Sequence, residues 1–293
     1  MRPRLAPYLA AALVLLAAGC APGGPATAPP RSGSSAPASS PCGSPAPARP
    51  GGGTWTCAFA DDFEGDQLDS RRWRPLLTRD SGVATPECRL DLPGTVAVAG
   101  GLLRLTARRL PHPVPCPVVG PTRFLGGGVS TRGLFSQTYG RFEIRARFPG
   151  GPGAGLHSAL WLWPEHSLHG AKSGEIDIAE WRSAQPYRVV PTLHLGRGSA
   201  ARSASSWRCW VRTPERFHTY VAEWAPHHVT ITYDGRTCLD VHLDRSAGSR
   251  APDPFDEPYF LVLNQAIGAG GNAPGEKARL PATMYVDYVH VWR

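Results

Sequence analysis

A two-residue alternation of apolar and polar side chains runs through most of the chain and restricts it to sheet structures. Residues 141–148 are the clearest case, because Phe142, Ile144, Ala146 and Phe148 would share one face and Arg and Glu residues the other. Such alternation is typical of strands buried on one side. Long segments with the helical period of 3.6 residues are hard to find, so an all-β fold is expected.

Turn signals between these runs predict hairpins. Residues 228–233 and 237–241 flank Asp234-Gly235, and Gly accepts the positive φ that a tight hairpin turn requires. Another alternating run covers residues 284–292. Many short strands, frequent Gly and Pro and no internal repeat of fixed period predict a β-sandwich.

The N-terminal residues have the order of a secretory signal rather than of a folded element. Two arginines precede an apolar run over 9–18, and Ala17-Ala18-Gly19 leads into Cys20. Cys20 resembles the cysteine of a bacterial lipobox, which is lipidated and becomes the mature N-terminus. Ala17 stands where Leu is usual, so simple secretion is the alternative. We therefore expect a signal peptide with a lipobox over 1–20 and an extracellular protein, tethered to the outer face of the cell membrane by lipid.

Composition divides the rest of the chain in two. Residues 21–53 are almost entirely Pro, Gly, Ala and Ser, a mixture that cannot bury enough apolar area to offset its ordering entropy. A disordered linker is expected over 21–53 and one β domain over 54–293. Four arginines and no acidic residue fall within 1–53, so the domain carries only +4 of the net charge of +8. This weak and scattered charge argues against a nucleic-acid partner, and we expect a monomer.

The cysteines indicate disulfides rather than a metal site. Setting Cys20 aside leaves six of the seven, an even number in an exported chain. Six cysteines allow fifteen pairings, and the sequence alone does not choose among them. Proximity favours Cys42–Cys57, Cys88–Cys116 and Cys209–Cys238. No pair has C-x-x-C spacing, so zinc is not expected, and no cofactor is predicted.

Three acidic residues crowd into one predicted strand, Glu175-Ile176-Asp177-Ile178-Ala179-Glu180. Glu175 and Asp177 would share a face, whereas simple alternation turns Glu180 to the other side. A β-bulge near Ala179 would bring all three carboxylates together. A retaining glycosidase needs such a set, because one carboxylate acts as nucleophile and another as general acid and then base. The alternatives are a solvated acidic strand edge and a calcium site.

Aromatic residues on the preceding strand favour a sugar-binding cleft. His157, Trp161 and Trp163 would share one face, and Trp181 directly follows the acidic strand. Flat indole rings are good platforms for the apolar face of a sugar, although each Trp taken alone could belong to the core.

The acidic motif resembles the E-x-D-x-x-E signature of glycoside hydrolase family 16, in its laminarinase-like, bulge-containing branch. The similarity covers nearly all of residues 54–293. The other segments that resemble the family are residues 61–63, 68–69, 73, 127–131, 139–143, 192–194, 217–220, 223–224, 260–268 and 286–289.

The resemblance implies a concanavalin A-like β-jelly-roll with a concave substrate cleft. By motif position, Glu175 would be the nucleophile, Asp177 its assistant and Glu180 the acid/base, with His194 and Asn264 reaching the substrate. The alternative for His194 is a hydrogen-bonded core histidine, and the alternative for Asn264 is a residue that caps a strand or lies in a turn. Some family members bind a structural calcium ion. Its possible ligands here are Asp62, Glu64 and Asp287.

Two departures from the family pattern concern the substrate. Laminarinase-like members typically read G-L-W-P-A-F-W before the catalytic strand, whereas residues 155–161 here place His157 at the first Trp. Residues 268–275 also lack a Trp that is often found there. The expected activity is endo-hydrolysis of a β-linked polysaccharide, with β-1,3- or mixed-linkage β-glucan as the leading substrate. The alternatives are a β-galactanase, a transglycosylase of the same fold and a non-catalytic lectin-like protein.

Overall fold

The structure is a computed structural model that describes residues 40–43, 45–81, 85–196, 202–243, 254–275 and 278–293. The expected signal peptide, Cys20 and residues 21–39 lie outside the described residues. No helix in the described part of the chain is long and apolar enough to cross a membrane.

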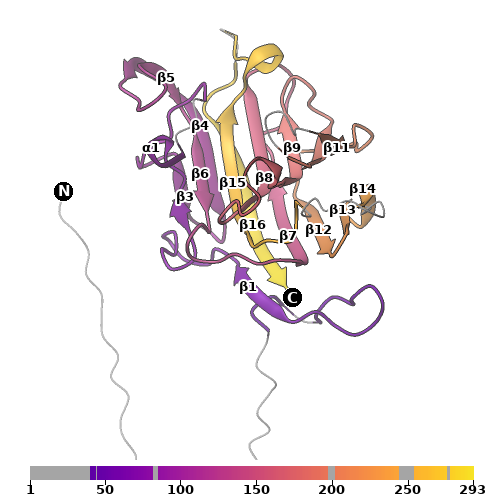
Figure 1. The fold of residues 1–293 in the computed structure, drawn as a ribbon. Helices are drawn as coiled ribbons and strands as arrows, with labels where there is room; N and C mark the ends of the chain where they lie inside the picture. The colour runs from indigo at the N-terminus through magenta and orange to yellow at the C-terminus, as the bar shows by residue number, and fades with distance from the viewer. Residues whose placement is uncertain (1–39, 44, 82–84, 197–201, 244–253, 276–277) are drawn as a thin grey trace, which may run out of the picture. The chain divides into compact units, whose positions relative to one another are not determined.

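Two antiparallel sheets make up the domain (Figure 1), and the all-β prediction is confirmed. The nine-stranded sheet has the order β14 (Arg236–His242), β13 (His228–Tyr233), β12 (His218–Ala225), β7 (Gly140–Arg147), β16 (Ala282–Trp292), β4 (Leu103–Val114) and β3 (Val96–Val98), with β1 (Cys57–Asp61) paired to β16 and β5 (Thr122–Leu125) to β4. The seven-stranded sheet has the order β11 (Ser203–Ser205), β10 (Val189–His194), β9 (Glu175–Arg182), β8 (Leu156–Pro164), β15 (Tyr259–Ile267), β6 (Gly127–Ser130) and β2 (Arg74–Pro75). The described helical segments are α1 (Thr78–Ser81), η1 (Gly170–Lys172) and η3 (Gly270–Asn272).

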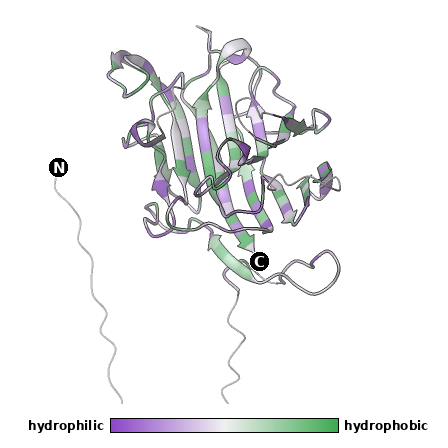
Figure 2. Ribbon diagram, in the orientation of Figure 1, coloured by the Kyte–Doolittle hydropathy of each residue, from purple (hydrophilic) through white to green (hydrophobic). Residues whose placement is uncertain are grey.

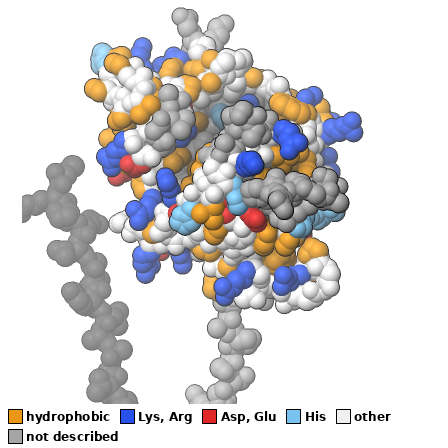
Figure 3. Space-filling view, in the orientation of Figure 1, with side chains coloured by type: hydrophobic (Ala, Val, Ile, Leu, Met, Phe, Trp, Pro, Cys, Tyr) orange, Lys and Arg blue, Asp and Glu red, His pale blue; other side chains and the backbone are white. Residues whose placement is uncertain are grey.

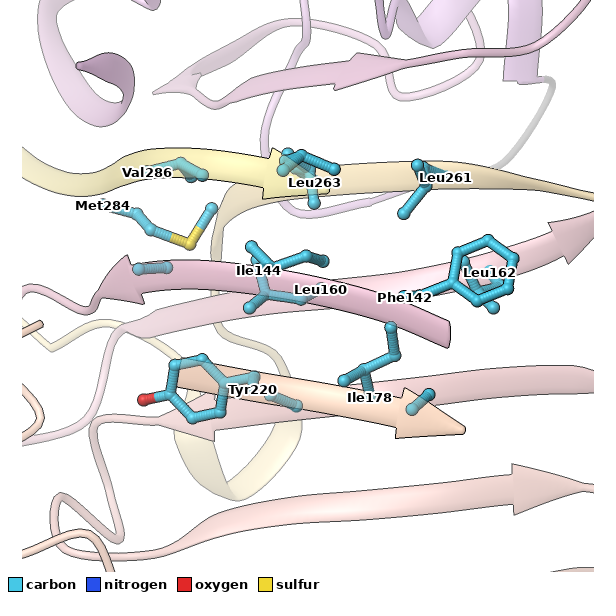
Figure 4. Packing of buried hydrophobic residues seen from close by; sticks show 14 of the residues in the cluster. Phe142, Ile144, Leu160, Leu162, Ile178, Tyr220, Leu261, Leu263, Met284 and Val286 are labelled. Atoms are coloured by element: carbon cyan, nitrogen blue, oxygen red, sulfur yellow. The ribbon is translucent and has the colours of Figure 1, made fainter. Parts of the chain in front are cut away.

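The core lies between the two sheets and is built by the predicted alternation. On β7, Phe142, Ile144 and Ala146 are fully buried, while the intervening residues are partly exposed. The change of hydropathy from residue to residue can be followed along the strands (Figure 2). Figure 4 shows side chains of the two sheets meeting in the core. The labelled residues are Phe142, Ile144, Tyr220, Met284 and Val286 from the nine-stranded sheet and Leu160, Leu162, Ile178, Leu261 and Leu263 from the seven-stranded sheet.

The hairpin predicted at Asp234-Gly235 is confirmed. β13 and β14 pair in antiparallel fashion, and Asp234 and Gly235 have φ values of 47° and 77°. Both residues therefore adopt the left-handed conformation that matches the twist of the flanking strands.

Residues 40–43 and 45–53 differ from the expected disordered linker, because they are attached to the domain. A disulfide joins Cys42 to Cys57, and Trp55 packs with Trp292 beside it. The backbone of Thr56 exchanges hydrogen bonds with Arg293. The composition of 21–53 hides this attachment, because one disulfide and one neighbouring Trp suffice to anchor a Pro- and Gly-rich segment. The other disulfides are Cys88–Cys116 and Cys209–Cys238, so all three pairs are those that proximity favours.

Charged side chains on the outer face of the nine-stranded sheet pair with one another. Arg141 is bridged to Glu143 and Glu223, and Arg145 to Asp287. These ion pairs agree with the predicted solvated strand face. Calcium binding by Asp62, Glu64 and Asp287 stays a prediction.

Candidate active site

The predicted β-bulge is present in β9 and sets the direction of its carboxylates. In the pairing with β8, the neighbours Leu160 and Trp161 face Ala179 and Asp177, so Ile178 is an extra residue. The pairing with β10 shifts at the same place. Ile178 and Ala179 both point into the core and are fully buried. The bulge therefore restores the parity that turns Glu180 to the same face as Asp177.

The three carboxylates open into one hollow of about 270 Å³ on the outer face of the seven-stranded sheet. Its lining residues are Glu175, Asp177 and Glu180 from β9, His157, Ala159 and Trp161 from β8, Asn264 from β15, and Leu76, Thr85 and Arg89 from the segment before β3. On the face shown in Figure 3, acidic side chains and histidines lie next to one another near the middle of the molecule, with Lys and Arg around them. The hollow thus combines acids, aromatic surface and cationic groups.

Glu180 is held by two basic side chains on the same oxygen. Arg182 Nη2 donates a hydrogen bond of 2.7 Å to Glu180 Oε1, and His157 Nε2 is hydrogen-bonded to that oxygen at 2.9 Å. Among the described residues, Oε2 has no hydrogen-bond partner. The carboxylate is therefore fixed by one oxygen while the other remains available.

Asp177 is buried and oriented by a chain of hydrogen bonds. His194 Nε2 lies 3.0 Å from Asp177 Oδ2, and the Ser203 hydroxyl lies 3.0 Å from Nδ1 of the same ring. These contacts link β9, β10 and β11, so the conformation of Asp177 is set by three neighbouring strands.

The electrostatic environments of the three carboxyls differ. Burial, together with the charge of Asp177, raises the pKa of Glu175 from 4.5 to about 8. Burial and the charge of Glu180 raise the pKa of Asp177 well above its ordinary value. Burial also acts to raise the pKa of Glu180, but the hydrogen bond from His157 and the Arg182 charge outweigh it and lower that pKa. In the free site, Glu175 therefore holds a proton near neutral pH and Glu180 is ionised.

The comparison with known proteins agrees with the two-sheet fold. The model of glycosyl hydrolases family 16 matches residues 93–289. The chain belongs to this family. It is an O-glycosyl hydrolase with the two-sheet jelly-roll of that family.

Curated relatives and solved structures support family 16 over most of the domain. A β-glucanase of Rhodothermus marinus is 34% identical over 82% of this chain and 85% of that protein. Glucan endo-1,3-β-glucosidase A1 of Niallia circulans is 30% identical over 80% of this chain, which spans only 37% of that longer protein. The laminarinase catalytic domain of Thermotoga petrophila superposes with a TM-score of 0.70 at 26% identity, over 82% of this chain and 98% of that one.

The predicted aromatic platforms of this family 16 domain lie in different places. Trp161 lines the hollow and donates its indole N–H to Asn264 Oδ1 at 2.8 Å. The ring of Trp163 is perpendicular to that of Trp161, with ring centres 5.7 Å apart. Trp181 is 0% exposed and stacks on Phe148 in the core, so its expected role in substrate binding is wrong. Trp181 follows Glu180 by one residue, and alternation turns it inward once the bulge has turned Glu180 outward.

Sequence reasoning missed two arginines of the site. Arg182 lies two residues after Glu180 on β9, and that spacing could have shown that they share a face. Arg89 comes from a loop remote in sequence and is bridged to the buried Glu87 at 2.8 Å. Nothing in the local pattern around Arg89 indicates that it reaches the hollow.

Proposed function

We propose that this protein is a retaining endo-β-glucanase that cleaves β-1,3 or mixed β-1,3/1,4 linkages. The observation that carries the proposal is the set Glu175, Asp177 and Glu180 on one face of a bulged strand, opening into a hollow lined by Trp161. The relatives from Rhodothermus marinus and Niallia circulans, whose names specify glucan activities, support β-glucan as the substrate.

Each carboxyl has a proposed role in the two-step cycle. Glu175 attacks the anomeric carbon while Glu180 gives its proton to the glycosidic oxygen, so the leaving sugar departs as an alcohol. Glu180, now ionised, takes a proton from water, and the resulting hydroxide releases the sugar from Glu175 with net retention. Asp177, hydrogen-bonded to Glu175, steadies that carboxylate as its charge changes.

Catalysis then requires a redistribution of protons. The resting site has a protonated Glu175 and an ionised Glu180, whereas attack requires the reverse. The two arrangements hold the same number of protons, so pH does not alter their ratio, and the active one is a minor form of the free enzyme. Entry of a sugar next to Glu180 Oε2 would favour the active form, since that oxygen would then meet a glycosidic oxygen that accepts a proton.

The cellular placement proposed here follows the sequence. Export through the signal at 1–20, lipid attachment at Cys20 and a monomeric, extracellular enzyme are all consistent with three disulfides, which form in oxidising compartments. Globomycin-sensitive processing and labelling with a radioactive fatty acid would test the anchor, and Cys20→Ser would abolish both.

The deciding experiment is reducing-sugar release by the purified chain from laminarin, lichenan, barley β-glucan, β-1,4-galactan and agarose. Activity on a β-glucan, lost by several orders of magnitude in Glu175→Ala and in Glu180→Ala, is the expected outcome. Glu215→Ala, a change at an exposed glutamate outside the hollow, is the matched control.

Other outcomes separate the alternatives. Release from β-1,4-galactan or agarose alone would assign a galactanase, which the replacement of a stacking Trp by His157 would explain. Oligosaccharides longer than the substrate would indicate transglycosylation. Binding that survives both substitutions, without release from any polymer, would contradict hydrolysis and support the lectin-like alternative.

A further inference from the structure

Three side chains with metal-ligand chemistry gather on the outer face of the β13–β14 hairpin. In the register of this pair, His228 lies opposite His242, and Thr230 lies opposite Asp240. Residues two apart on a strand share a face, and directly opposed residues have Cβ atoms about 4.5–5.5 Å apart. His228, Asp240 and His242 therefore share one side of the hairpin.

The donor atoms of the three residues are close enough for a single ion. One nitrogen from each imidazole and one carboxylate oxygen all lie within 4.8 Å of one another. His228 Nε2 is 2.5 Å from Asp240 Oδ1, and the Thr230 hydroxyl lies 3.3 Å from the same oxygen. The rings of His228 and His242 are parallel within 7°, with centres 4.1 Å apart. An ion pair between His228 and Asp240 would explain the 2.5 Å contact between these two residues, but it would not explain why the imidazole of His242 lies beside them.

We propose that His228, Asp240 and His242 bind one divalent transition-metal ion, for which Zn²⁺ is the reference. Two imidazole nitrogens and one carboxylate oxygen form a donor set that Zn²⁺ takes in proteins, at about 2.0–2.2 Å from each ligand. The same set binds Cu²⁺ more tightly by the general order of divalent affinities, whereas Ca²⁺ and Mg²⁺ prefer oxygen ligands. Small rotations of the partly exposed side chains bring the donors to these distances, and water fills the remaining positions.

This site is separate from the catalytic hollow. Val229, Ile231 and Tyr233 alternate with His228 and Thr230 on β13 and are buried on the side that faces the seven-stranded sheet. The Tyr233 hydroxyl donates to the carbonyl of Ile178 in β9, across the core. His228 and its partners therefore point away from the sheet that carries Glu175, and hydrolysis is not expected to depend on the metal.

The position of the cluster indicates what the metal would do. β14 is an edge strand of the nine-stranded sheet, and Asp234-Gly235 closes one end of the hairpin. His228 and His242 lie at the opposite, open end. A metal held by side chains of both strands would tie β13 to β14 at that end.

The test uses the purified full chain without a histidine tag, stripped of metal, and titrates it with Zn²⁺ alone by calorimetry and by competition with a coloured chelator. One equivalent per chain is expected, with a rise in the thermal unfolding midpoint. His242→Ala and Asp240→Ala should lose both the binding and the rise. His218→Ala is the matched control. It removes a histidine that is paired with one carboxylate, Asp234, and that does not belong to the described cluster of His228, Asp240 and His242.

Two results would overturn the proposal. One is the absence of saturable binding in the wild type. The other is binding of the same stoichiometry and affinity in His242→Ala and Asp240→Ala. Binding and unfolding are read without substrate, so a failure here is distinguishable from a failure of the proposed hydrolase activity.

Discussion

Glu180 is the residue in which this chain departs most from the requirements of its proposed reaction. A general acid should keep its proton near neutral pH, yet His157 and Arg182 both contact Oε1 and stabilise the ionised form. The charged or titratable groups that interact with Glu180 come from three strands: His157 on β8, Glu175, Asp177 and Arg182 on β9, and Tyr233 on β13. The resemblance to the laminarinase-like branch predicts Trp at the position of His157, so this environment would be a feature of this chain rather than of the motif.

Replacing His157 tests its influence on Glu180. In His157→Phe, Glu180 loses a hydrogen bond that lowers its pKa. Glu180 has the lower pKa of the Glu175–Glu180 pair and therefore sets the acidic limb of the kcat/KM profile, so that limb should move to higher pH. The measurement is kcat/KM on the best polysaccharide from pH 3 to 10. His290→Phe removes another histidine–carboxylate pair, with Asp62, and should leave the limb in place. An acidic limb that does not move in His157→Phe would show that His157 does not tune Glu180.

The buried carboxyl of Glu175 should make the folded state less stable in alkali. Its pKa is raised from 4.5 to about 8, so the folded protein binds more protons than the unfolded chain between these values. The associated stability is complete below pH 4.5 and is lost as the pH rises through 8, at about 1.4 kcal/mol for each unit of pKa shift. Glu175→Gln keeps a neutral side chain of the same shape, so its unfolding free energy should fall less over this range. Urea unfolding at pH 4.5, 6, 7 and 8.5 provides the comparison, and equal slopes would contradict the assigned burial effect.

At the scale of the strand, one extra residue in β9 reconciles the sequence with the site. Ile178 and Ala179 both face the core, and the carboxylates on either side of them face the hollow. The register with β8 shows that Leu160 already has Ala179 as its partner. Removal of Ile178 would thus leave a regular strand in which Asp177 and Glu180 still face the hollow and Ala179 still faces the core.

Changes in length at the bulge should have opposite effects. Deletion of Ile178 should keep Glu180 in the hollow and retain measurable hydrolysis, at a packing cost of about 2–5 kcal/mol for the lost side chain. Insertion of one Ala after Ala179 should turn Glu180 into the core and abolish hydrolysis. Circular dichroism and thermal unfolding show whether each variant folds, and reducing-sugar release measures the activity. A folded insertion variant with full activity would contradict the parity argument.

The sequence could predict what depends on local periodicity and not what depends on register between strands. Alternation and parity were enough for the β7 face, the β13–β14 hairpin and the bulge. The contact of His157 with Glu180 could not be foreseen, since it requires that His157 be paired with Arg182 and Ala159 with Glu180. Parity alone predicts that Trp181 turns inward after the bulge, so its closeness in sequence to the carboxylates is a poor guide to its position.

At the scale of the whole molecule, the segment before β1 is part of the domain. Cys42 and Trp55 pack against Trp292, and β1 adds to the nine-stranded sheet beside β16. Composition could not reveal this, because the packing partner is more than 200 residues away in the chain.

The Cys42–Cys57 disulfide should stabilise the domain without supporting catalysis. Its residues are 15 apart, and closing a loop of this length contributes about 3 kcal/mol in the chain-entropy account. The double variant Cys42→Ser, Cys57→Ser should unfold at a lower temperature and be cleaved by chymotrypsin after Trp55, which is buried against Trp292 in the native domain, with unchanged kcat/KM. The matched pair Cys209→Ser, Cys238→Ser alters a bridge at β14 and should leave Trp55 protected. Protection of Trp55 in the first variant would show that packing alone holds the segment.

The position of β16 also has a consequence for the time course of folding. β16 lies between β7 and β4 in the middle of the nine-stranded sheet, yet it follows every other strand of that sheet in the chain. Until residues 282–292 are available, the strands on its two sides have no shared neighbour, and the buried face of the other sheet lacks part of its cover. The domain is thus expected to close late and all at once, and to remain a substrate for chaperones until then.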